Sequence, residues 1–153
     1  MDLNEYKKPE VLEKYAFFWS EARLLIAALA LFIGGTPPVY YLTFPLISGL
    51  VGMLLTASWI ISGLVSGYLF YRWWTGGQMV FGGKAPRDTA AFFVNIVSGL
   101  NLGFTGLSGT NIGMSISSNY ILFIIVGVLY LASAYHLYAR WTAFGKKIFS
   151  PQV

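Results

Sequence analysis

The sequence predicts an all-α, polytopic membrane protein: a bundle of four transmembrane helices with a short amphipathic interfacial helix at its N-terminus. Hydrophobic residues make up 56% of the 153 residues and charged residues only 10%, whereas a soluble domain carries about 25% charged residues. In addition, residues 46–71 contain no charged side chain. As a helix this stretch would be roughly 39 Å long, enough to cross a hydrocarbon core of about 30 Å with some tilt.

The N-terminal segment is the most charged part of the chain, since every acidic residue except Asp88 precedes residue 24. Pro9 suits the first turn of a helix, and Leu12, Tyr15 and Trp19 follow it as an apolar stripe beside charged neighbours. We therefore expect residues 1–15 to form a helix on the membrane surface; the alternative is a frayed tail. No basic region leads into a cleavable apolar segment, so no removable signal peptide is expected.

Four spans follow within a single membrane domain, residues 1–153. They are expected at residues 16–33, 46–71, 90–104 and 120–138.

Local residues mark where these spans begin and end. The first ends at the Gly-Gly-Thr-Pro-Pro stretch of residues 34–38, which breaks a helix. Asp88 or Thr89 is expected to cap the third span and Asn119 the fourth. Aromatic residues beside arginines at the ends of spans are expected to anchor the protein at the lipid interface: Trp73, Trp74 and Trp141.

The basic residues predict the orientation. All ten lie in residues 7–23, 72–87 or 140–147, and the other two connections hold none. Because basic loops stay in the cytoplasm, both termini and the middle connection are expected there. The net charge of +4 is explained by this topology, so nucleic acid is not an expected partner.

The second and fourth spans resemble each other weakly. Laying one over the other aligns Ser66 with Ser133 and Tyr71 with Tyr138. A duplicated hairpin would explain the match. The alternative is convergence, because Tyr, Trp and Arg collect at membrane interfaces in unrelated helices.

Small residues recur along the second span: Ser58, Ser62, Gly63, Ser66 and Gly67. Such rows let helix backbones approach closely, and packing contacts drive helix association in lipid. The row therefore predicts a helix-packing seam.

The third span carries a polar stripe: Asn95, Ser98, Asn101 and Thr105, at steps that place them on one helix face. Lipid satisfies none of their polar groups, so they are expected to face the bundle or a subunit interface. They could form interhelical hydrogen bonds, or they could line a path for a small uncharged polar solute.

Few side chains suggest chemistry. Glu21 could pair with Arg72 or Arg140 at the ends of neighbouring spans, or it could reach the headgroups. His136 is the single histidine and the chain has no cysteine. We therefore expect no catalytic, cofactor or metal site.

These observations favour a non-enzymatic structural or accessory membrane subunit, acting through helix packing with further copies or with other membrane proteins. Two alternatives are a passive channel or carrier for a small uncharged polar solute, lined by the third span, and a lipid-binding or lipid-modifying protein. Membrane lipids are expected partners in each case.

Overall fold

The computed structural model describes residues 8–44 and 47–149. Six helices lie within them: α2 (Pro9–Phe32), the 3-10 helix η1 (Pro38–Tyr41), α3 (Ser48–Thr75), α4 (Pro86–Ser108), α5 (Ile112–Ile116) and α6 (Tyr120–Ala143). The four long helices are each long and apolar enough to cross a membrane. The all-α fold class and the four-helix membrane bundle are thus confirmed, and the chain is a multi-pass membrane protein.

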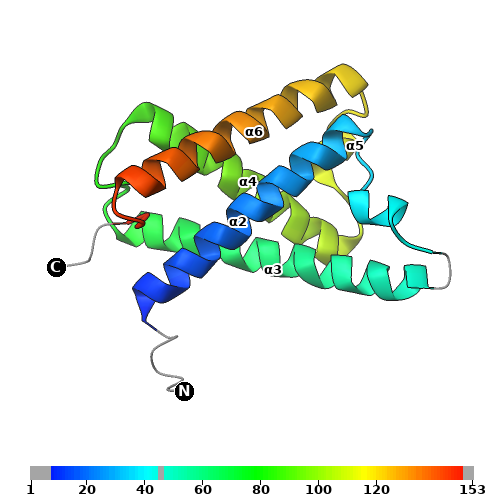
Figure 1. Cartoon of the computed structure of the whole chain (residues 1–153), viewed down its shortest axis with the longest axis horizontal. Coiled ribbons are helices and arrows are strands. Elements are labelled where there is room, and N and C mark those ends of the chain that lie inside the picture. The colour runs from blue at the N-terminus through cyan, green and yellow to red at the C-terminus, as the bar shows by residue number, and fades with distance from the viewer. Residues whose placement is uncertain (1–7, 45–46, 150–153) are drawn as a thin grey trace.

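The four long helices alternate in direction (Figure 1). One end of the bundle holds the start of α2 and α4 and the end of α3 and α6, and we call it the basic end; the opposite end carries η1 and α5, and we call it the loop end. α3 packs mainly on α4, and α2 packs mainly on α6. α2 crosses α3 near the basic end and diverges from it toward the loop end (Figure 1).

The first helix differs from the prediction. Residues 9–15 are not a separate interfacial helix, because α2 runs without a break from Pro9 to Phe32. No glycine or proline interrupts this stretch after Pro9, which occupies the first turn. The expected stripe is also reversed here, since Glu13 is buried and Tyr15 is exposed. Residues 1–7 lie outside the described residues.

The second and fourth spans extend further at their C-terminal ends than predicted. α3 continues past Tyr71 to Thr75, and α6 continues past Tyr138 to Ala143. Asn119 caps α6 as expected, because its side chain accepts a hydrogen bond from the backbone N–H of Ile121.

The predicted cap of the third span is wrong. α4 begins at Pro86, with Ala85 at the N-cap position and no side-chain cap. Proline suits the first helical position because its ring fixes φ and its missing N–H would be unpaired there. Asp88 therefore lies inside the first turn, where its side chain is buried.

The connection after α4 is partly helical. α4 ends at Ser108, and Gly109 follows with a φ of 74°, in the left-handed region that favours glycine. Asn111 then caps α5 by accepting a hydrogen bond from the backbone N–H of Met114. This fixes a short helix across the loop end.

Large apolar side chains fill the half of the bundle nearer the basic end. Phe17 stacks on Trp141 with ring centroids 5.2 Å apart, and Trp73 meets Phe93 edge-on at 4.9 Å. Trp73 and Trp141 are consequently buried core residues rather than the predicted interface anchors. Trp74 is 60% exposed on the outer surface, as an anchor would be.

The hairpin of α2 and α3 and the hairpin of α4 and α6 have similar residues at their ends. α2 and α4 both begin with proline, and α3 and α6 both carry an arginine in their last turn. Duplication of one hairpin remains a prediction.

Candidate functional site

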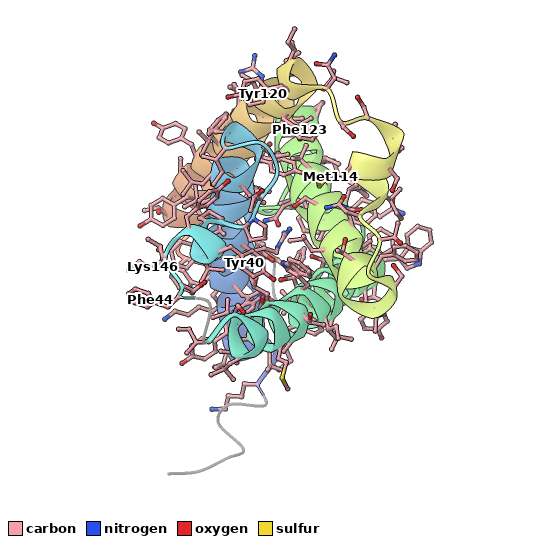
Figure 2. The ribbon with its side chains drawn as sticks, turned by 90° about the vertical axis from the view of Figure 1, so that its right-hand side faces the viewer. Tyr40, Phe44, Met114, Tyr120, Phe123 and Lys146 are labelled. Atoms are coloured by element: carbon pink, nitrogen blue, oxygen red, sulfur yellow. The ribbon has the colours of Figure 1, made fainter. Side chains whose placement is uncertain are left out.

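The half of the bundle nearer the loop end encloses a cavity of about 580 Å³. Its wall comes from all four long helices and from the connections that hold η1 and α5. Figure 2 looks onto this end and labels two of the lining residues, Met114 and Phe123. The lining residues nearest the basic end are Trp19, Ser62, Ser98 and Tyr130. Beyond them lies the aromatic core, which closes the cavity toward the basic end.

Small side chains leave this space open. Ala22, Ala27 and Ala30 of α2 face it, as do Ser58 and Ser62 of α3. None of these side chains extends far from the backbone, so helices that touch at the basic end enclose an empty volume here. The cavity size is typical of small-molecule sites, which span about 300–1,000 Å³.

The polar stripe of α4 divides between two environments. Ser98, Asn101 and Thr105 line the cavity, whereas Asn95 does not. The Asn101 Nδ2 donates to Asn111 Oδ1 at 3.0 Å, and its Oδ1 accepts from the Ile112 backbone N–H. The stripe thus forms one wall of the cavity and holds α5 over the loop end.

Asn95 joins two charged residues of α2. Its Nδ2 donates to Glu21 Oε1 at 3.1 Å, and its backbone oxygen accepts from Arg23 Nη2 at 2.8 Å. Asn95 Oδ1 also accepts from Arg23 Nη2, and Ser98 Oγ accepts from Arg23 Nη1. Glu21, Arg23 and Asn95 are all buried. The sequence does not connect Arg23 with the stripe, although a charged residue inside a span is a functional candidate by default.

The ion pairs at the basic end differ from the prediction. Glu21 pairs with neither arginine: Arg72 Nε donates to Glu13 Oε1 at 2.7 Å, and Arg140 Nη2 donates to Asp88 Oδ2 at 2.9 Å. Glu13 lies nearer the basic end than Glu21 and therefore meets the last turn of α3.

Asp88 is the centre of the second pair. Its carboxylate also accepts from Arg140 Nε, and its Oδ1 lies 2.7 Å from His136 Nε2. The side chain is 3% exposed, so these contacts neutralise a buried carboxylate. Antiparallel neighbours bring the start of α4 beside the end of α6, a pairing that the sequence could have suggested.

The predicted small-residue seam is split. Gly63 lies against Gly103 of α4, so closely that a Cβ on Gly63 would stand 2.7 Å from the Gly103 Cα. Ser66 is buried against Gly99. A Cβ on Gly67, in contrast, would have no neighbour within 4 Å. Gly67 therefore lies outside the seam, because crossing helices diverge on either side of their closest approach.

A second, smaller cavity of about 390 Å³ lies at the basic end, beside Arg72, Trp141 and the C-terminal segment. Glu10 and Glu13 in its wall pair with Lys147 and Arg72. Within the described residues, no three His, Cys, Asp or Glu side chains gather as a metal site.

No family model matches this chain, and no curated protein or solved structure is significantly similar to it.

Proposed function

We propose that this protein binds a small solute in the cavity at the loop end, as a membrane carrier or receptor would. The observation that supports this proposal is a cavity of about 580 Å³, closed toward the basic end, with mostly apolar walls and a few polar groups among them. That combination is typical of ligand sites, where apolar surface supplies affinity and a few polar groups set orientation.

A cavity that is closed toward the basic end favours binding over passive conduction. The inner end of the cavity is followed by the buried rings of Phe17, Phe92 and Trp141. A solute could pass them only if the helices moved apart. A carrier or receptor therefore fits this arrangement better than an open channel.

The accessory-subunit function has less support. It depended on a small-residue row that would receive a helix from another protein. Gly63 of that row is covered by Gly103 of the same chain, and Ser58 and Ser62 face the cavity. Association with further copies or with other membrane subunits stays a prediction.

The experiment is a binding titration of the protein in nanodiscs of zwitterionic lipid, with hexanoate and its amide, hexanamide, as probes. Trp19 and Trp59 line the cavity and serve as fluorescent reporters. We expect a saturable change with at least one probe. Ala27→Phe should abolish it by filling the cavity, while Leu25→Phe, on the exposed face of the same helix, should retain it. Failure of both probes to bind would overturn the proposed function.

For the orientation, we propose that the loop end faces away from the cytoplasm, because the basic residues gather at the other end. Thr110→Cys and Gly83→Cys test this in a chain without native cysteine. Thr110 is exposed, and a side chain on Gly83 would meet nothing within 4 Å. An impermeant thiol reagent on intact cells should label the first variant and spare the second; the reverse pattern would invert the topology.

A further inference from the structure

Arg23 stands at the inner end of the cavity, well inside the membrane. It is 7% exposed and belongs to the cavity wall. Nine residues of α2 separate it from Phe32, so it lies roughly 14 Å from the loop-end terminus of the helix. A guanidinium at this depth is costly and is retained only where it has a partner or a task.

The partners that Arg23 has are neutral. Its hydrogen bonds go to Ser98 Oγ and to the backbone and side-chain oxygens of Asn95. No described carboxylate lies within ion-pair distance of it. Glu21, the nearest acid in sequence, instead accepts from the Asn95 amide. The positive charge is therefore not directly matched.

The guanidinium also has unused donors. An arginine has five N–H groups, and three bonds from Arg23 are formed within the described residues. Its Nε is fully buried and has no hydrogen-bond partner there. The Nη1 atom carries two N–H groups and makes one bond within the described residues, to Ser98. Its second N–H can therefore donate to an acceptor bound in the cavity.

We propose that the cavity binds a small organic acid, with its carboxylate on Arg23 and a compact apolar body against the walls. This rests on the proposed function and replaces the uncharged solute expected from the third span alone. A carboxylate oxygen can accept a charge-assisted hydrogen bond from the remaining Nη1 N–H of Arg23, and a low-dielectric site strengthens the attraction between the two charges. Ile26, Leu102 and Phe123 in the wall favour an organic body over an inorganic anion.

The ligand is expected to come from water rather than from the bilayer. With its carboxylate on Arg23 at the inner end of the cavity, its apolar body points toward the loop end. A membrane fatty acid would have to draw its headgroup away from the interface to adopt this pose. Oleate incorporated in the nanodiscs should therefore fail to displace hexanoate, and displacement would contradict the aqueous source.

The test compares hexanoate with hexanamide on the wild-type protein at fixed ionic strength. The two probes have the same body and differ in charge, so we expect hexanoate to bind at least about tenfold more tightly. Arg23→Gln should bring the two affinities together, and Arg23→Lys should retain part of the difference because it keeps the charge but lacks the guanidinium's several donors. Lys14→Gln removes an exposed charge from the basic end of the same helix and should leave the difference intact.

The outcomes separate this inference from the proposed function. Equal wild-type affinities for the two probes would overturn the acid and leave the cavity as a ligand site. Displacement of hexanoate by phosphate at equal concentration would show a plain anion site and would also overturn it. If Arg23→Gln does not fold, the affinities of the wild-type protein and of Arg23→Lys for the two probes still test the proposal.

Discussion

The two halves of the bundle are built from different side chains. Toward the basic end, Phe17, Trp73, Phe92 and Trp141 are buried and fill the space between the helices. Toward the loop end, α2 presents alanines and α3 presents serines, and a cavity lies between the helices. Side-chain volume along each helix thus decides where the bundle is solid and where it is hollow.

The two halves also differ in how their buried charges are paired. At the basic end, buried Glu13 and Asp88 are each matched by an arginine. At the inner end of the cavity, Arg23 is held only by neutral groups. Such ion pairs stabilise the fold, because removing one partner leaves the other as an unpaired buried charge. A buried charge beside an empty space, without a direct ion-pair partner, is suited to a ligand.

The largest effect is expected where the helices touch most closely. Gly63→Leu would force α3 away from α4, because Gly103 already lies in contact. We expect a loss of about 3 kcal/mol in folding stability, seen as aggregation or a broadened elution profile in mild detergent. Gly67→Leu is the matched control, since a side chain there meets open space. Equal behaviour of the two variants would contradict the seam.

A smaller loss of stability is expected from breaking the ion pair between Asp88 and Arg140, in the half nearer the basic end. Asp88→Ala leaves Arg140 and His136 without their shared acceptor, at a cost of about 2–3 kcal/mol. The apparent melting temperature in detergent should fall by roughly 5–10 °C. Glu10→Ala removes a carboxylate whose side chain is 65% exposed and should change it by no more than about 2 °C. If Asp88→Ala lowers the melting temperature no more than Glu10→Ala does, the buried pair is dispensable for stability.

Much of the fold could be predicted because its determinants are local. Long uncharged stretches gave four spans, and Asn119 marked the start of α6. The continuity of α2 could also have been inferred, since nothing after Pro9 breaks the helix. Its charged first turns suggested a surface position because the sequence does not show that Glu13 meets Arg72.

The candidate site was harder to predict because it depends on which helices meet. The polar stripe of α4 was found from its spacing, but its partner Arg23 lies on a helix far away in sequence. Likewise, the serines and glycines of α3 form one row in sequence, yet they face a cavity at Ser58 and a helix at Gly63. Periodicity gives the face of a helix, and only the crossing of helices decides what that face meets.

The contrast between a hollow and a solid half is tested most directly by two cysteines on one helix. Ser58 lines the cavity, whereas Ser66, two turns nearer the basic end, is buried against α4. In nanodiscs, a small polar thiol reagent should modify Ser58→Cys readily and leave Ser66→Cys unmodified until the protein unfolds, and hexanoate should slow the first reaction. Equal reactivity at the two positions, or an unreactive Ser58→Cys, would contradict the account.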